Sequence, residues 1–214
     1  MEDILQGKTL VALGDSLFEG NKLGNEVTWI NKLGKKHNMT VYNHGKNGNP
    51  VARFPDMKGK PMCERYADME DGADYVVVIG GANDHNHDVP IGENDSTDTM
   101  TFKGALNVLI RGLLAKYPRA RFLFMTNYHR KSTEKRNAAG LTEIDYVLAM
   151  EEVCHLYGLP CFNNYYNSGI SFQNEAQRPW LDEGVSLGIG QNNHFSDEGY
   201  NRLLPLYESL LMRL

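Results

Sequence analysis

Residues 8–20 read Lys-Thr-Leu-Val-Ala-Leu-Gly-Asp-Ser-Leu-Phe-Glu-Gly, a short apolar run that ends at Gly14 and continues into Asp15 and Ser16. An apolar strand that ends at a glycine and enters a polar turn places a hydroxyl group at the rim of a sheet. Ligands of open α/β sheets bind at that rim, beyond the carboxyl ends of the strands. Taken alone, Asp-Ser is more often a helix cap, because both side chains accept from free N–H groups at helix starts. Ser16 is therefore a candidate that needs partners elsewhere in the chain.

Apolar runs of strand length alternate along the chain with segments of helical period. Strands are predicted at residues 9–13, 40–42, 75–79, 121–126 and 159–162, and helices at 22–36, 102–117, 142–157 and 197–212. Pro205 lies inside the last helix and is expected to kink it or divide it in two. This alternation predicts an α/β protein with a parallel sheet and helices on both of its faces.

The length and charge of the chain limit the classes of protein it can be. Its 214 residues contain no linker, internal repeat or low-complexity tract, so we expect one domain over residues 1–214 that buries a sizeable core. Lys and Arg number 22 and Asp and Glu 27, which gives a net charge of −5. That mild acidity gives no electrostatic reason to expect nucleic-acid binding.

The cysteines and the N-terminal residues indicate the compartment. Cys63, Cys154 and Cys161 are odd in number and form no Cys-x-x-Cys pair, which favours reduced thiols in a reducing compartment. The first eight residues are too polar for a signal peptide, and no apolar run reaches transmembrane length. We therefore expect a soluble, cytoplasmic protein that does not associate with membranes. Release by cell lysis, as for a phage product, would leave no mark in the sequence.

Two further candidate sites follow the second and third predicted strands. The second strand leads into a turn that ends at Gly48, where the missing Cβ lets a backbone N–H approach a ligand. The third leads into Gly80-Gly81-Ala82-Asn83-Asp84, which places an amide side chain after two glycines. A serine that attacks a carbonyl group generates an oxyanion, which fixed N–H donors stabilise. The N–H groups of Ser16 and Gly48 and the amide of Asn83 are three such donors. Each of the latter two residues, taken singly, is typical of an ordinary turn.

A candidate base for Ser16 lies near the other end of the chain. His194 stands in Asn-His-Phe-Ser-Asp-Glu-Gly-Tyr, just before the last predicted helix. A serine needs an adjacent base to become nucleophilic, and a histidine can take its proton and return it to the leaving alcohol. Alternatively, His194 is an ordinary loop residue. The four signals together, in this order and with three of them just past predicted strands, favour chemistry over turns.

This ordered set resembles the SGNH (GDSL-type) serine hydrolase family over nearly the whole chain. The resemblance rests on four blocks, which are Leu13–Leu17, Asn43–Gly48, Gly81–Asp84 and His194–Tyr200. It implies a three-layer, flavodoxin-like fold with a central parallel five-stranded sheet, and ester hydrolysis through an acyl-serine intermediate. It also implies that Ser16 is the nucleophile and His194 the base. Ser16, Gly48 and Asn83 would form the oxyanion hole, and no metal or organic cofactor is implied.

One position departs from the family pattern. The family commonly has an Asp three residues before its histidine, and this chain has Gln191 there. Replacing a triad carboxylate by an amide lowers turnover by roughly four orders of magnitude in a serine protease. Three outcomes stay open: a Ser-His dyad oriented by Gln191 or a backbone carbonyl, an atypical triad in which Asp182 or Glu183 reaches His194, or weak activity. We favour the dyad.

Several other residues are candidates for substrate contact. His85, His87 and Asp88 look like metal ligands, but two histidines at this spacing without a distant partner do not predict a zinc site. We expect His87 to line the mouth of the site. Trp180 is a candidate stacking platform for a sugar ring, with anchoring of its own loop as the equal alternative. Two segments, 84–101 and 128–140, are expected to govern substrate choice.

The sequence thus predicts a serine hydrolase of carboxylic esters. A small acyl ester such as an acetyl group on a carbohydrate or another small alcohol is the expected substrate. The alternative is a catalytically weak or inactive module of the same fold that binds an acylated glycan. A flavodoxin-like nucleotide-binding domain is a weaker alternative, because no Gly-x-Gly-x-x-Gly or phosphate-binding Gly-Lys motif follows the first strand. The oligomeric state cannot be read from the sequence.

Overall fold

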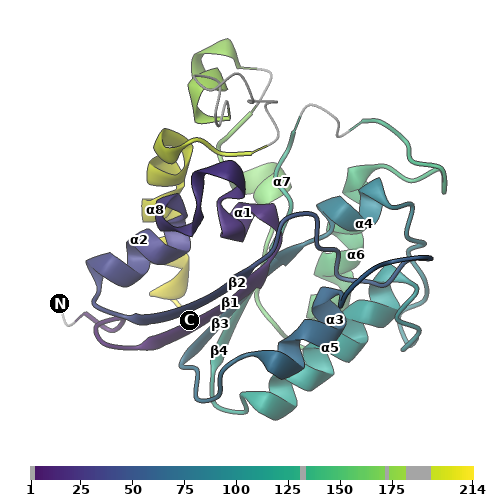
Figure 1. The fold of residues 1–214 in the computed structure, drawn as a ribbon, viewed down its shortest axis with the longest axis horizontal. Helices are drawn as coiled ribbons and strands as arrows, with labels where there is room; N and C mark the ends of the chain where they lie inside the picture. The colour runs from purple at the N-terminus through teal and green to yellow at the C-terminus, as the bar shows by residue number, and fades with distance from the viewer. Residues whose placement is uncertain (1–2, 131–133, 172–173, 182–193) are drawn as a thin grey trace.

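The computed structural model describes residues 3–130, 134–171, 174–181 and 194–214. A five-stranded sheet forms its centre, with strand order β2-β1-β3-β4-β5 and every pairing parallel (Figure 1). The strands are β1 (Thr9–Gly14), β2 (Thr40–Gly45), β3 (Tyr75–Gly80), β4 (Arg121–Thr126) and β5 (Cys161–Phe162). The predicted α/β class, the parallel sheet and its five strands are confirmed.

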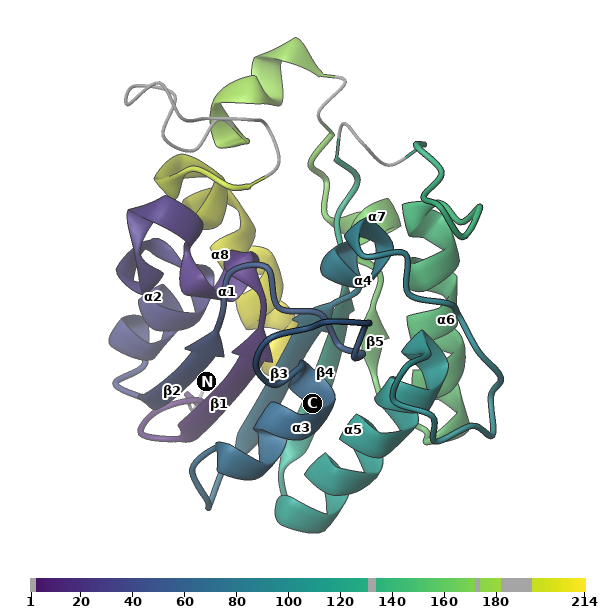
Figure 2. The ribbon, with the colours of Figure 1, turned by 45° about the vertical axis from the view of Figure 1, so that its right-hand side comes forward.

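Helices cover both faces of the sheet, which gives three layers (Figures 1 and 2). Helices α1, α2 and α8 lie on one face, and α3, α5 and α6 on the other. The α-helices are α1 (Ser16–Glu19), α2 (Trp29–Lys36), α3 (Met62–Arg65), α4 (Ala82–Asn86), α5 (Phe102–Lys116), α6 (Glu143–Leu156), α7 (Asn164–Asn167) and α8 (Asp197–Leu211). Short 3₁₀ turns span Asn21–Leu23, Asn25–Val27, Tyr66–Asp68 and Glu175–Trp180.

The two layers of helices bury opposite faces of the same strands. In β1, Val11 and Leu13 pack into the core under α5 and α6, whereas Leu10 and Ala12 pack into the core under α1, α2 and α8. All six residues of β3 are buried, as expected for a central parallel strand covered on both faces. The rigid sheet therefore fixes where each strand ends, and the candidate site depends on those ends.

The helix predicted over residues 22–36 is wrong in its first half. Helix α2 begins only at Trp29, and Thr28 is its N-cap, whose side chain accepts from the N–H of Asn31. Upstream, Asn21 and Gly24 have φ of +46° and +84°, a conformation that no right-handed helix contains. The polar segment between Ser16 and Thr28 instead folds into α1 and two 3₁₀ turns.

Of the two outcomes expected at Pro205, division of the last helix is wrong, because α8 is one uninterrupted helix. Proline removes one main-chain donor, which leaves the carbonyl four residues earlier, that of Asn201, without its helical partner. Both residues are exposed, so solvent can hydrogen-bond that carbonyl.

The other differences lie at strand ends. The second strand extends from Thr40 to Gly45, beyond the predicted residue 42, and the fifth begins at Cys161 instead of 159. The segment predicted as a loop from residue 84 begins inside α4. A Cβ on Gly45 would lie 2.1 Å from the backbone nitrogen of Glu19, so only glycine lets α1 pack this closely on the end of β2.

Within the part of the chain that the structure describes, no helix combines the length and apolar character needed to cross a membrane.

Candidate active site

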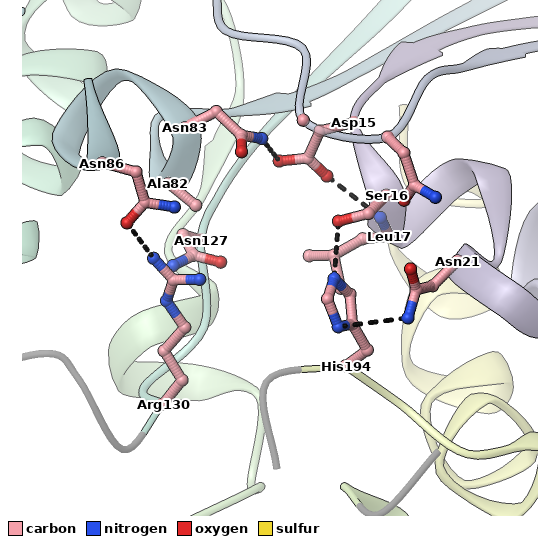
Figure 3. Close-up of a pocket in the computed structure, with 12 residues that line it drawn as sticks. Asp15, Ser16, Leu17, Asn21, Ala82, Asn83, Asn86, Asn127, Arg130 and His194 are labelled. Carbon is pink, nitrogen blue, oxygen red and sulfur yellow. Dashed lines mark hydrogen bonds between the residues drawn. The ribbon is translucent and has the colours of Figure 1, made fainter. Parts of the chain in front are cut away.

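A cavity of about 310 Å³ opens at the carboxyl edge of the sheet, where the strand order reverses. Strands β2 and β3 lie on opposite sides of β1 in the sheet. Ligands of open α/β sheets bind where the strand order reverses in this way. The residues that line the cavity are Asp15, Ser16, Leu17, Asn21, Asn47, Gly48, Ala82, Asn83, Asn86, Asn127, Arg130 and His194 (Figure 3). Ser16, Gly48, Asn83 and His194 are therefore brought together.

Ser16 and His194 are in direct hydrogen-bond contact. The distance from Ser16 Oγ to His194 Nε2 is 2.7 Å, within the range needed for proton transfer (Figure 3). Ser16 is the first residue of α1, and the carboxylate of Asp15 caps that helix by accepting from the N–H of Leu17 at 3.0 Å. The capping role expected for Asp-Ser and the placement beside a base therefore occur together.

Helix α8 and the residues before it hold His194 against α1. Tyr200 donates its hydroxyl to the carbonyl of Leu17 at 2.8 Å, which ties the base-bearing segment to the residue after Ser16. Phe195 is buried against Tyr128, with ring centroids 4.3 Å apart. Ser196 caps α8 by accepting from the N–H of Gly199. These contacts fix the residues that directly follow His194.

Gly48 reaches the cavity through a loop that is fixed at several points. Its φ of +66° favours glycine, and a Cβ there would meet nothing within 4 Å. On one side of it, the N–H of Lys46 donates to the carbonyl of Gly14 and that of Asn47 to the carboxylate of Glu19. The loop is thereby attached to the strand and helix that carry Ser16.

Asp84 fixes the other end of the same loop. Its carboxylate, fully buried, accepts from the N–H groups of Val51 at 3.0 Å and Ala52 at 2.8 Å. Burial raises the pKa of Asp84 to about 7, and the nearby Asp15 carboxylate adds to the rise, against the two N–H donors that lower it. The residue after Asn83 thus positions the segment that presents Gly48.

The side chain of Asn83 connects the first and third strand ends. Its amide nitrogen donates to Asp15 Oδ2 at 3.1 Å and lies 3.3 Å from the carbonyl of Asn49 (Figure 3). Burial raises the pKa of Asp15, whereas the Leu17 N–H and the charges of His194 and Arg130 oppose that rise. The amide of Asn83 therefore lies between the ends of β1 and β3, where Asp15 and the carbonyl of Asn49 accept from it.

The second ring nitrogen of His194 faces Asn21. The distance from His194 Nδ1 to Asn21 Nδ2 is 3.5 Å. Asn21 holds a left-handed conformation directly after α1, which turns its side chain toward the imidazole (Figure 3). Gln191, Asp182 and Glu183, the residues that sequence reasoning considered for orienting His194, lie outside the described residues.

Two other predicted contact residues lie outside the cavity lining. His87 is exposed and stacks on Phe54, with ring centroids 3.9 Å apart. Trp180 donates to Glu198 Oε1 at 3.1 Å, and Arg202 lies over its ring. The structure thus gives Trp180 the anchoring contacts that were its alternative interpretation. Of the long 84–101 segment, only Asn86 lines the cavity.

Sequence reasoning missed the wall of the cavity that faces Ser16. Asn127 and Arg130 line it from the segment after β4, and both bond to the buried Glu143 of α6. Arg130 lies in the 128–140 segment that is expected to govern substrate choice, whereas Asn127 lies just before that segment. The signal that could have identified Arg130 is its place directly beyond a strand end. No local pattern in the sequence identifies Glu143 as the partner of Arg130.

Among the described residues, no group of three or more His, Cys, Asp or Glu side chains is arranged to hold a metal ion. His85 and His87, which look like metal ligands in the sequence, lie in different surroundings. His85 is buried and contacts the carbonyl of Lys135 at 3.0 Å, whereas His87 is exposed. The cavity lining itself contains a serine, a histidine, an aspartate, an arginine and several amide side chains.

Comparison with known proteins places this geometry in a family. Residues 12–202 match the profile of the GDSL-like lipase/acylhydrolase family. A search of curated protein sequences gives no significant match. A solved structure that is 33% identical aligns over 99% of both chains with a TM-score of 0.88.

More distant solved structures share the fold. A protein from Lactobacillus plantarum is 26% identical over 97% of this chain and 98% of its own, with a TM-score of 0.81. A "possible lipase" from Chitinophaga pinensis is 17% identical over 96% of this chain and 98% of its own, with a TM-score of 0.73.

Proposed function

Since the chain belongs to the GDSL-like lipase/acylhydrolase family, we propose that it hydrolyses carboxylic esters with Ser16 as nucleophile and His194 as general base. The observation that carries this proposal is the 2.7 Å contact between Ser16 Oγ and His194 Nε2. A serine within hydrogen-bond distance of an imidazole can lose its proton as it attacks, which is the activation that a hydroxyl nucleophile requires.

The reaction proceeds in two half-reactions. Ser16 Oγ attacks the ester carbonyl while its proton passes to His194 Nε2, and a tetrahedral oxyanion forms. His194 then returns that proton to the leaving oxygen, the carbon–oxygen bond of the alcohol breaks, and an acyl-serine remains. In the second half, His194 takes a proton from water as the water oxygen attacks the acyl group. It then returns this proton to Ser16 Oγ as the bond between Oγ and the acyl carbon breaks and the carboxylic acid leaves.

The donors for the oxyanion are the N–H groups of Ser16 and Gly48 and the side-chain amide of Asn83. Support for this assignment comes from their shared cavity and from the contacts that fix them. Preorganised donors stabilise the developing charge without reorganisation, and each typically contributes about 3–4 kcal/mol to lowering the barrier.

The lining of the cavity favours a small acyl group and a polar alcohol. Amide, hydroxyl, carboxyl, guanidinium and imidazole groups dominate it, and Leu17 and Ala82 are the only apolar side chains among the described lining residues. A long acyl chain would bury apolar surface against these polar groups and leave them without partners. A carbohydrate acetylesterase from Sinorhizobium meliloti shares the fold, at 14% identity and a TM-score of 0.63. An acetyl ester of a carbohydrate fits both the polar lining of the cavity and this likeness in fold.

The alternative is a weak or inactive module of this fold that binds an acylated glycan. The observation that favours it is Gln191, which stands where the family commonly has the carboxylate that orients the base. An amide at this position can orient an imidazole but cannot stabilise its positive charge.

Two measurements separate the alternatives. Hydrolysis of 4-nitrophenyl acetate should be readily measurable for the wild-type protein and at least about 10³-fold slower for Ser16→Ala, as in other enzymes that lose their nucleophile. A fluorophosphonate probe should label Ser16 within minutes, and neither Ser16→Ala nor His194→Ala should be labelled at that rate. Equal hydrolysis by wild type and Ser16→Ala, with no labelling, would favour the binding module.

A further inference from the structure

The wall of the cavity opposite Ser16 and His194 contains polar side chains that the proposed chemistry does not use. Asn86 comes from the end of α4, and Asn127 and Arg130 come from the segment after β4. Figure 3 shows these three side chains across the cavity from the Ser16–His194 pair. They contribute neither the nucleophile, the base nor the oxyanion donors, so their role must concern another part of the substrate.

A buried carboxylate fixes this wall in place. Glu143 of α6 is 2% exposed and accepts from Asn127 Nδ2 at 2.9 Å and from Arg130 Nε at 2.7 Å. Asn127 and Arg130 are themselves 5% and 8% exposed. Arg130 Nη2 also lies 3.4 Å from Asn86 Oδ1. The wall is therefore formed before any ligand binds, which reduces the entropic cost of recognition.

The chemistry of these contacts dictates which atoms face the cavity. A carboxylate only accepts, so the amide nitrogen of Asn127 faces Glu143 and its oxygen faces away. A guanidinium only donates, so the amide oxygen of Asn86 faces Arg130 and its nitrogen faces away. In Figure 3 the Asn127 oxygen and the Asn86 nitrogen both point toward the space in front of Ser16. The wall thus offers one acceptor beside one donor.

The charges around the wall disfavour an anionic ligand. The guanidinium of Arg130 is paired with Glu143 at 2.7 Å, and the carboxyl group of Asp15 lies in the same cavity. An incoming carboxylate or phosphate would meet a guanidinium that already forms an ion pair with Glu143. It would also lose its hydration next to the acidic side chain of Asp15. A hydroxyl group both donates and accepts, and it carries no charge, so it matches the wall.

We propose that Asn86 and Asn127, held by Arg130 and Glu143, form a subsite that binds a hydroxyl group on the alcohol portion of the substrate ester. This inference rests on the proposed esterase function. The leaving alcohol must lie next to His194, which returns its proton, and Asn127 and Arg130 face His194 across the cavity (Figure 3). The substrate is then an ester of a neutral polyhydroxylated compound, and not of an alkyl alcohol or an anionic one.

A matched pair of substrates isolates this hydroxyl group. Cyclohexyl acetate and trans-2-hydroxycyclohexyl acetate differ by one hydroxyl beside the ester, and the acetate released from each can be measured directly. The wild-type kcat/KM should be about tenfold higher for the hydroxylated ester, as expected for one added hydrogen-bonding group. The ester trans-2-acetoxycyclohexanecarboxylate, which carries a carboxylate on the alcohol portion in place of the hydroxyl group, should not share this preference.

Two variants test the residues. Asn86→Leu should reduce the tenfold preference, measured as the ratio of kcat/KM for the two acetates, to within about twofold. Asn86 is exposed, so this variant should fold. Asn127→Leu should have the same effect, and circular dichroism shows whether the loss of a donor to Glu143 is tolerated. Asn201→Leu, an exposed asparagine on α8 outside the cavity, is the matched control and should keep the preference.

The outcomes of this experiment are distinct from failure of the esterase proposal. If neither acetate is hydrolysed in a Ser16-dependent manner, the proposed function itself is wrong. If both are hydrolysed but the wild type does not prefer the hydroxylated ester, the subsite is wrong and the esterase stands. The same conclusion follows if the preference survives in Asn86→Leu, because the contact would then lie elsewhere.

Discussion

The side chain of Asn83 donates a hydrogen bond to the carboxylate of Asp15, at 3.1 Å, and so connects the ends of the two central strands. The second amide hydrogen has only a long contact, at 3.3 Å, with the carbonyl of Asn49. The hydrogen bond to Asp15 fixes the orientation of the Asn83 amide group. We expect a substrate oxyanion to replace the weaker contact with the carbonyl of Asn49. One carboxylate thus both caps the helix that carries Ser16 and orients the proposed oxyanion donor.

Removal of the Asn83 amide should slow the chemical step more than binding. We expect Asn83→Ala to lower kcat for 4-nitrophenyl acetate by about 10²–10³-fold with little change in KM, because an oxyanion donor acts mainly in the transition state. Steady-state kinetics measures both constants. Asn201→Ala, outside the cavity, is the control. A rise in KM with kcat unchanged would show that Asn83 binds substrate instead of stabilising the oxyanion.

A carboxylate in place of Asn21 should strengthen His194 as a base. Asn21→Asp would put a charged acceptor near His194 Nδ1, at the present 3.5 Å contact. It would fix the tautomer that leaves Nε2 free to take a proton and would stabilise the imidazolium that forms. We expect kcat to rise about tenfold and the acid limb of the pH–rate profile to move to higher pH, because a nearby negative charge favours the protonated imidazole.

The control for this variant is Asn25→Asp, which adds the same charge in the next 3₁₀ turn, outside the cavity lining. It should change neither kcat nor the pH profile. An Asn21→Asp protein with the wild-type rate and profile would mean that another group already orients His194.

Burial of Asp84 should make the stability of the protein fall as the pH rises from about 4 to about 7. Its pKa is raised from 3.8 to about 7, so in this range the folded chain keeps a proton that the unfolded chain has lost. Because the folded state binds more protons, the free energy of unfolding decreases with pH, by at most about 1.4 kcal/mol per pH unit, and levels off above the folded pKa.

Urea denaturation of wild type and Asp84→Asn at several pH values measures this effect. The difference in unfolding free energy, wild type minus variant, should decrease between pH 5 and pH 7 and stay constant above pH 8. A difference independent of pH would show that Asp84 is ionised in the folded protein throughout.

Gly45 should be sensitive to the smallest side chain. In Gly45→Ala the new Cβ would lie 2.1 Å from the nitrogen of Glu19 and 2.3 Å from the carbonyl carbon of Phe18, so the backbone of α1 must move. We expect a loss of about 1–3 kcal/mol of stability and a lower kcat, because α1 carries Ser16. Gly158→Ala, at a left-handed position with open space around it, should lose only about 1 kcal/mol and keep its kcat.

The strands and the chemistry at their ends were predictable because both have strong local signals. The run Tyr75–Ile79 is β-branched and apolar, and the chain order of strands and helices specifies a parallel sheet whose carboxyl ends share one edge. The approach of Ser16, Gly48 and Asn83 follows from that edge, so residues far apart in sequence could be grouped without coordinates. His194 joined them through its place in the ordered set that resembles the family.

The remaining features depend on contacts that no local pattern encodes. Helix α2 starts at Trp29 because Thr28 caps it and because Asn21 and Gly24 upstream are left-handed. The helical spacing of apolar residues in the same segment predicted an earlier start. The Glu143 contact with Arg130 joins α6 to the segment after β4 through side chains alone. The orientation of His194 by Gln191 or Asp182 stays a prediction, because both lie outside the described residues.

The contact of Ser16 with His194 also bears on when the protein can become active during its synthesis. His194 follows Ser16 by 178 positions in the chain, so a nascent chain carries the proposed nucleophile well before the proposed base is made. An esterase organised in this way stays inert toward the esters around it until translation has passed residue 194. Any shorter product that ends before residue 194 would be inert as well.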